Sequence, residues 1–456
     1  MATLKRFIRQ AACVFVLVLP FAAEANPFER QLANGLRVIV KEDRRAPTAV
    51  HMAWYRVGAM DEHNGTTGVA HLLEHMMFKG TPTTGPGEFS RVVAAAGGRD
   101  NAFTNKDYTA YFQQVPKQKL ALVMQLEADR MRHLTLDPKE FDQEIRVVME
   151  ERRLRTDDNP RARLFEALGA VAFEAHPYRV PVIGWMNDLQ NMTVQDARDW
   201  YDRWYVPNNA YVVVVGDVDH ADVFKLAEKY YGGLEARALP SRKPQVEPEQ
   251  RGIRRLVVKA PAELPMVAMA YKVPVIRDVE QDADPYALEI LAAVLDGHDA
   301  ARFSKNLVRK QKLAVSAGAG YDATSRGPGL FYLLGSPVRG KTRAELEAGF
   351  RAEIARIVKD GVTVDELARA RAQLVSGEIY KLDSMFAQAM EIGQHEAAGV
   401  PYTLNKRLIE KLESVTTEQV QSVAQKYFID DLLTVAELDP QPLPQTPRAS
   451  SAKTRH

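Results

Sequence analysis

Two histidines and a glutamate stand close together in an otherwise apolar stretch. Residues 68–80 read GVAHLLEHMMFKG, and His71, Glu74, His75 and Lys79 are the polar side chains among them. On a helix, residues four apart lie on one face, so both imidazoles can reach a single ion. The glutamate between them is placed to take a proton from water that the metal activates. This H-x-x-E-H arrangement predicts zinc bound by His71 and His75, with Glu74 as the general base.

The surroundings of this motif bear on how it is interpreted. The apolar residues fall on all sides of a 3.6-residue period, which is typical of a fully buried helix. Imidazoles and a carboxylate inside such a helix are costly unless they have a partner. The alternative is that the histidines are ordinary core or surface residues, because three fixed positions can coincide by chance. The apolar surroundings favour a metal.

A third ligand could come from a helix predicted over residues 138–155, which begins at an N-cap, Asp137. At about 100° per residue, Glu144 and Glu151 border the apolar stripe of this helix, whereas Glu150 points to the opposite side. The helix phase therefore leaves Glu144 and Glu151 as candidates. The alternative is a solvated acidic face that pairs with the neighbouring arginines.

A strand pair is predicted between the two helices. Its first strand, Asn101 to Thr104, carries small and polar residues, including Ala102, where a core strand would carry valine or isoleucine. One interpretation is an edge strand whose backbone pairs with an extended peptide. The alternative is a plain surface strand.

Composition limits the class of protein. The 456 residues are 46% hydrophobic and 26% charged with a net charge of +1, which suits a globular enzyme of two or three domains. No basic excess indicates a nucleic-acid partner.

The N-terminus predicts secretion. Lys5, Arg6 and Arg9 precede an apolar run over residues 11–23 and a small-x-small site. We interpret residues 1–25 as a signal peptide and expect a periplasmic mature chain. The alternative, a short membrane anchor, is disfavoured because the run is too short for a stable span. The sole cysteine, Cys13, lies in this segment, so a mature chain would contain neither disulfides nor a thiol nucleophile.

An internal repeat indicates two copies of one domain. Leu189 and Trp204 have counterparts in Leu412 and Tyr427, each 223 positions later, with similar residues around them. The second copy carries no H-x-x-E-H. The predicted domains are a zinc-bearing N-terminal domain (26–235), a proline-rich and charged linker (236–252), a homologous C-terminal domain (253–440) and a disordered tail (441–456).

Together these motifs resemble the pitrilysin and mitochondrial-processing-peptidase family of zinc peptidases, the inverzincins. The resemblance covers nearly the whole mature chain, through NGLRV, HLLEHMMFKGT, GGRDNAFTNKDYTAY, NNAYVVVVGDVD and GVTVDELARARAQL. It implies an α+β fold of two homologous domains, each a mostly antiparallel sheet flanked by helices, forming a clamshell. It also implies that Glu151 is the third zinc ligand, that Glu144 supports the site, and that Asn101 and Ala102 pair with substrate.

One segment departs from the family pattern. Active relatives supply an arginine and a tyrosine, seven positions apart, from the domain without zinc. The matching stretch here is LVRKQKLAV, which places Val308 and Val315 at those positions. Arg309 and Tyr321 lie nearby but out of register. Some family members divide these residues between two chains, so the resemblance implies a homologous partner subunit or a homodimer.

The sequence thus predicts a zinc-dependent endopeptidase, or the zinc-bearing subunit of one, with Zn2+ as cofactor and short or unfolded periplasmic peptides as substrates. Neither a nucleic-acid partner nor a stable membrane span is expected. The alternative is a non-catalytic subunit with the same fold that holds peptides or supports assembly.

Overall fold

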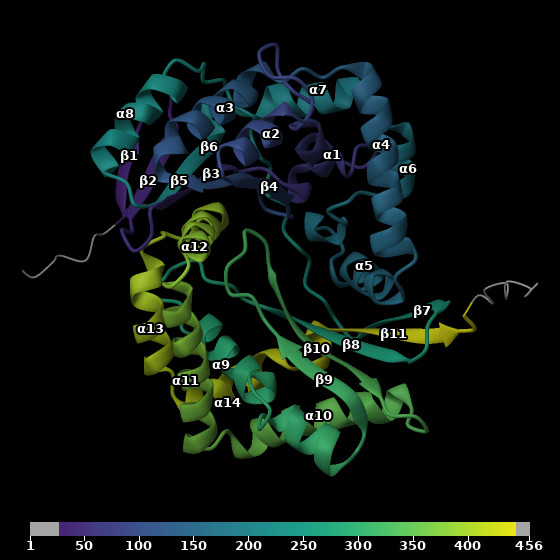
Figure 1. The fold of residues 1–456 in the computed structure, drawn as a ribbon. Coiled ribbons are helices and arrows are strands. Elements are labelled where there is room, and N and C mark those ends of the chain that lie inside the picture. The colour runs from purple at the N-terminus through teal and green to yellow at the C-terminus, as the bar shows by residue number, and fades with distance from the viewer. Residues whose placement is uncertain (1–26, 444–456) are drawn as a thin grey trace, which may run out of the picture.

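Two mixed β-sheets with helices packed around them make up the protein, as the computed structural model in Figure 1 shows for residues 27–443. One sheet comes from the first half of the chain and the other from the second half, and they lie in the upper and lower parts of Figure 1. The predicted α+β fold class, with two similar halves, is confirmed.

The first sheet has six strands, and β-branched and aromatic residues dominate its centre. Its strands are β1 (Phe28–Gln31), β2 (Arg37–Glu42), β3 (Thr48–Tyr55), β4 (Arg99–Thr104), β5 (Thr109–Pro116) and β6 (Ala210–Gly216). Their order across the sheet is β1-β2-β6-β3-β5-β4, so β4 lies at an edge. Only β2 and β6 pair in parallel. The short strand β1 pairs with β2 across the turn at Gly35, whose φ of 87° suits glycine.

The helices of the first half, except α5, pack around this sheet. They are α1 (Val69–Met76), α2 (Glu88–Ala95), α3 (Leu120–His133), α4 (Pro138–Arg152), α5 (Pro160–Ala172), α6 (Met186–Asn191), α7 (Val194–Trp204) and α8 (His220–Tyr231). The N-cap predicted for α4 is present, since the Asp137 carboxylate accepts from the backbone N–H of Lys139 and Glu140.

The second sheet repeats the first without a counterpart of β1. Its strands are β7 (Arg254–Pro261), β8 (Met266–Val273), β9 (Ala314–Gly320), β10 (Gly329–Pro337) and β11 (Leu433–Gln441). The order β7-β11-β8-β10-β9 matches β2-β6-β3-β5-β4, and β7 and β11 are again the parallel pair. The helices are α9 (Asp284–Asp296), α10 (Arg343–Asp360), α11 (Val364–Lys381), α12 (Met385–Ala398), α13 (Leu404–Ser414) and α14 (Thr417–Tyr427).

The repeat seen in the sequence corresponds to the same elements in both halves. Helices α7 and α14 begin 223 residues apart, at Val194 and Thr417, and each is preceded by a threonine that forms a capping box. The strands that follow, β6 and β11, begin with the same offset. The two halves therefore share helix caps as well as strand order.

Each half contributes one helix to the sheet of the other. Leu164 and Leu168 of α5 pack with residues of β7, β8 and β11, whereas Ala389 and Ile392 of α12 pack against β3 and β6. Figure 1 shows α12 against the first sheet and α5 beside the second. Burial of these faces links the halves through apolar contacts, which are the main source of stability in a protein core.

Residues 236–252 contain no helix or strand and lie in the connection from α8 to β7. The predicted domain limits stay a prediction. Strand β11 ends at Gln441, one residue into the predicted tail. The predicted signal peptide, with Cys13, and residues 444–456 lie outside the described part of the chain. Between residues 27 and 443, no helix combines the length and apolarity needed to cross a membrane.

Candidate active site

Helix α1 presents the motif histidines and begins at a glycine that the site requires. Gly68 has a φ of 91°, and a Cβ there would lie 2.6 Å from the carbonyl oxygen of Ile183. The Glu62 carboxylate accepts from the backbone N–H of Gly68 at 2.8 Å and of Ala70 at 2.9 Å. These contacts fix where α1 starts and therefore where its side chains point.

His71, His75 and Glu151 come together between α1 and α4. One potential ligand atom from each lies within 4.8 Å of the others. The Glu151 carboxylate is 3.8 Å from His71 Nε2 and 3.4 Å from His75 Nε2. Glu150 instead points outward, with 57% of its side chain exposed, and pairs with Arg153. The structure thus places Glu151 as the helix phase allowed.

Glu144 lies on the other side of His75. Its carboxylate is 2.8 Å from His75 Nδ1 and 2.5 Å from Lys79 Nζ. Burial raises the pKa of Glu144, but the hydrogen bonds to His75 and Lys79 outweigh it, and the net pKa is lowered. Glu144 is therefore ionised and holds the ring of His75 with Nε2 toward Glu151.

The two histidines differ in their electrostatics. Burial, with the charges of His75 and Arg155, lowers the pKa of His71 to about 3, so its ring is neutral and has a free lone pair. His71 Nδ1 is buried and has no hydrogen-bond partner. Burial also lowers the pKa of His75, but Glu144 and the nearby carboxylates outweigh this effect and leave that pKa raised.

These residues fit a divalent metal ion of the zinc type. Two imidazoles and a carboxylate are a ligand set that zinc takes. Tetrahedral ligands at about 2.1 Å from zinc lie roughly 3.4 Å apart, which is close to the 3.4 and 3.8 Å separations from Glu151. Without an ion, the partly buried Glu151 carboxylate faces the neutral ring of His71, whose Nδ1 has no hydrogen-bond partner. The donor set and the unpartnered atom both favour metal binding.

Glu74 lies beside this cluster and contacts the edge strand. Its side chain is nearly buried, and its carboxylate accepts from Thr104 Oγ1 at 2.5 Å. Burial raises the pKa of Glu74, and the Thr104 hydrogen bond partly opposes that shift. A carboxylate whose pKa is raised toward neutral is suited to general-base chemistry. The sequence analysis missed Thr104 as a contact of this residue, because only the fold brings β4 against α1.

Arg155 is a second residue that the sequence analysis missed. It lies in a π-helical segment, Arg153–Asp157, that follows α4, and its guanidinium pairs with the Glu151 carboxylate. Most of the Arg155 side chain is exposed. The arginines at the end of the predicted helix were the available sign of this contact. The sequence spacing did not predict the π-helical geometry that directs Arg155 to Glu151.

The predicted substrate strand occupies the edge position. Strand β4 pairs only with β5 among the described strands, so its other edge is unpaired. Asn101 is exposed and Ala102 is partly buried, and the Asn101 side chain accepts from the Ala102 backbone N–H at 2.9 Å. An unpaired edge next to Glu74 has the backbone geometry that an added strand requires.

The second half places no arginine and tyrosine in the family register. Val308 packs partly into the second core, and Val315 is 54% exposed on β9. Arg309 is exposed, whereas the Tyr321 hydroxyl donates to the carbonyl oxygen of Pro274 at 2.5 Å. That hydroxyl is engaged within its own half.

Comparison with known proteins identifies the family. Residues 37–184 match the family described as insulinase (peptidase family M16), and residues 191–374 match the peptidase M16 inactive domain. The crystal structure of a protease from Helicobacter pylori superposes with a TM-score of 0.86 at 30% identity, over 91% of this chain and 100% of that one. The chain belongs to the M16 peptidase family.

Curated relatives of this M16 peptidase carry protease names. The Helicobacter pylori zinc protease PqqE is 37% identical over 292 residues, which are 63% of this chain and 64% of that protein, so the match spans slightly less than two thirds of its length. An uncharacterized zinc protease of Mycobacterium tuberculosis, Rv2782c, is 29% identical over 94% of this chain and 97% of its own. The predicted family, and with it the expectation of an enzyme of the zinc-peptidase class, is confirmed.

Proposed function

We propose that this chain is a zinc-dependent endopeptidase, or the zinc-bearing subunit of one, and that His71, His75 and Glu151 bind the metal. The observation that carries the proposal is the approach of these three side chains from two helices, with Glu74 beside them. The zinc-protease names of the relatives support zinc as the ion.

In this proposal the protein residues divide the work of hydrolysis. Bound zinc would supply Lewis-acid polarisation of water and of the scissile carbonyl. Glu74 takes the proton of the attacking water and passes it to the leaving amine. The raised pKa of Glu74 matches both steps, because the same group must accept and then release the proton near neutral pH.

Two neighbours hold these groups in place. Glu144 accepts from His75 Nδ1, which fixes the tautomer and presents Nε2 to the metal. Thr104 donates to Glu74 and fixes one carboxylate oxygen, which leaves the other free for water. Because Thr104 belongs to β4, substrate binding and general-base orientation meet on one strand.

Peptide is proposed to bind as an added strand along β4, at Asn101 and Ala102. The free edge of β4 beside Glu74 supports this placement. An extended backbone is needed for such pairing, which favours short or unfolded peptides over folded proteins. The N-terminal sequence supports a periplasmic location for the mature chain.

The valines in the second half favour a second candidate function. Val308 and Val315 stand where active relatives have arginine and tyrosine, so a homologous partner subunit that carries those two residues would complete substrate binding. Under the alternative, the chain holds peptide or supports assembly without turnover. The intact set of His71, His75, Glu151 and Glu74 supports catalysis.

A zinc and cleavage assay tests the proposal. We expect purified mature chain, alone or with a co-expressed homologous partner, to hold one zinc and to cleave a quenched peptide. Glu74→Gln should keep the zinc and lose activity by about 100-fold or more. Glu150→Gln, an exposed change on the same helix as Glu151, is the matched control and should act as wild type. Full activity in Glu74→Gln would reject the general-base role.

A further inference from the structure

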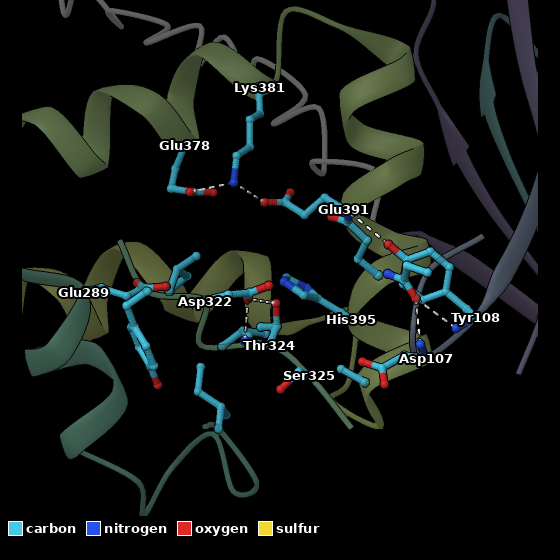
Figure 2. A pocket seen from close by; sticks show the side chains of 17 residues that line it. Asp107, Tyr108, Glu289, Asp322, Thr324, Ser325, Glu378, Lys381, Glu391 and His395 are labelled. Carbon is cyan, nitrogen blue, oxygen red and sulfur yellow. Dashed lines mark hydrogen bonds and ion pairs between the residues drawn. The ribbon is translucent and has the colours of Figure 1, made fainter. Parts of the chain in front are cut away.

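A cavity of about 290 Å3 lies between the two halves, and none of the proposed metal ligands lines it. The turn between β4 and β5 forms one wall, and α9, α11, α12 and the loop after β9 form the others. Figure 2 shows Glu378, Lys381 and Glu391 along one side, with Asp322 and His395 facing them. The volume is at the small end of the range for ligand pockets.

The lining of this pocket carries more acidic groups than its single lysine can neutralise. Five carboxyl groups line it, and Lys381 is the one lysine or arginine among the described lining residues. Lys381 is already shared between Glu378 at 2.7 Å and Glu391 at 3.2 Å. Unbalanced like charges in a partly buried space repel one another, so this arrangement is unfavourable without a counter-charge.

Three of these carboxyl groups have no ion pair with a described residue: Asp107, which accepts from the Tyr178 hydroxyl and the Arg326 backbone N–H, and Glu289 and Asp322. Asp322 accepts only from the backbone and hydroxyl of Thr324, and no hydrogen bond or ion pair joins Glu289 to another described residue. Burial, with the charges of Glu378 and Asp322, raises the pKa of Glu289 to about 8. The nearby charge of Lys381 lowers this pKa but does not outweigh burial and the two carboxylates.

His395 supplies an independent sign that a ligand is missing. Its side chain is 6% exposed, and its Nδ1 is buried without a hydrogen-bond partner. Figure 2 shows its ring directed from α12 toward Asp322. Burial and the nearby Lys381 lower the pKa of His395 to about 4, so the ring is neutral and can accept a hydrogen bond.

The geometry argues against a metal in this pocket. In the described part of the chain, three-residue clusters with ligand atoms close enough for one ion occur at His71, His75 and Glu151 and at Glu42, Asp219 and His220, but not here. Separated acceptors around a cavity suit a larger cation with several N–H donors. Guanidinium and primary ammonium groups have this character.

We propose that the pocket bounded by Glu289, Asp322 and His395 binds a guanidinium or primary ammonium group. The ligand donates to the carboxylates and to His395 Nδ1 and supplies the missing positive charge. Its source is either a basic side chain of a bound peptide or a small free amine.

The position of the pocket favours a peptide as the source. Thr104, at the end of β4, donates to Glu74, while Asn105, Asp107 and Tyr108 line the pocket. Three residues span at most about 11 Å, so Asp107 lies within that distance of Thr104. A basic side chain on a peptide that extends beyond β4 can therefore reach the pocket, which gives a preference for basic peptides. This role in substrate choice rests on the proposed function, but binding of the cation does not.

The first experiment measures binding without turnover. Zinc-loaded mature chain is titrated calorimetrically with agmatine and with its neutral analogue N-butylurea. We expect agmatine to bind and N-butylurea not to bind. Loss of one charge-assisted contact in Glu289→Gln or Asp322→Asn should weaken agmatine binding by about tenfold or more. Glu410→Gln, on the exposed face of α13, is the control and should leave it unchanged.

The second experiment separates the two sources. A peptide with one arginine and the same peptide with citrulline are bound to Glu74→Gln protein, with and without Glu289→Gln. An arginine preference that Glu289→Gln removes identifies a peptide subsite. Agmatine binding without any peptide preference identifies a free amine as the ligand and still supports the pocket.

The failures of the two proposals are distinguishable. Equal binding of charged and neutral probes in both experiments overturns the cation pocket, even if the enzyme cleaves peptides. Binding of agmatine by a chain that never cleaves peptide overturns the proposed function and leaves the pocket standing. Circular dichroism of both pocket variants shows that any loss is not unfolding.

Discussion

At the scale of single residues, the candidate metal site depends on groups that do not touch the metal. Glu144 joins His75 to Lys79, and Thr104 holds Glu74. Each contact selects one orientation of a side chain that would otherwise rotate. Loss of either contact should therefore weaken zinc binding or slow hydrolysis, although the proposed metal ligands and general base remain in the chain.

Glu144→Gln should weaken zinc binding by about 10- to 100-fold, because a neutral amide holds His75 less strongly in its ligating orientation. Competition with a chelator of known affinity measures the change. Glu150→Gln, six residues further along the same helix and exposed, is the matched control. Equal affinities for both variants would show that Glu144 does not position the ligand.

Thr104→Val should lower kcat by roughly tenfold with little change in zinc content, because it removes a hydrogen bond to Glu74 and keeps the shape of the side chain. Thr104→Ser retains the hydroxyl and should restore most of the rate. Steady-state kinetics and metal analysis together provide the test. A valine variant with an unchanged kcat would exclude the orienting role.

At the scale of elements, α12 docks on the first sheet through a surface that leaves no room for a side chain. A Cβ at Gly393 would lie 2.1 Å from the Trp54 ring, and the Gly393 carbonyl accepts from the Tyr211 hydroxyl at 2.7 Å. The backbone of α12 at Gly393 is therefore in direct contact with side chains of the sheet. Nothing local in the α12 sequence specifies this contact.

Gly393→Ala should lower the free energy of unfolding by about 1–3 kcal/mol or more, because the helix must move away from Trp54. Gly377→Ala in α11 is the matched control, since a Cβ there meets nothing within 4 Å. Alanine should raise helix stability at that site by about 0.5–1 kcal/mol. Urea denaturation compares the two variants. Equal stabilities would mean that α12 does not dock as described.

At the scale of the whole molecule, a bound ion would tie α1 to α4. Removing zinc by dialysis against a chelator should lower Tm, since an ion at 100 times its Kd contributes about 2.7 kcal/mol. Adding zinc back should restore Tm. His71→Ala should show a low Tm that does not respond to zinc. Scanning calorimetry measures these values, and a wild-type Tm independent of zinc would contradict the proposed site.

The sequence was most informative where structure is local. The helical period places His71 and His75, four residues apart, on one face of a helix. The phase of α4 likewise excluded Glu150 as a ligand. The phase of α4 could not choose between Glu144 and Glu151. That choice depends on how α1 and α4, which are far apart in the sequence, pack against each other. Thr104 was missed for the same reason.

The fold followed the same division. Offsets of 223 residues revealed the repeat because caps and strands recur in order. The exchange of α5 and α12 left no comparable signal, since an apolar helix face does not specify which sheet it covers. The edge position of β4 was visible in its small and polar residues, whereas its closeness to Glu74 was not.

The exchanged helices have a consequence for cutting the backbone. Residues 235–246 are exposed between the halves and form a segment without helix or strand that a protease can reach. A single nick there would leave two fragments interlocked, because each carries a helix seated on the other. Such a nicked protein should elute as one species from a sizing column and come apart only in denaturant.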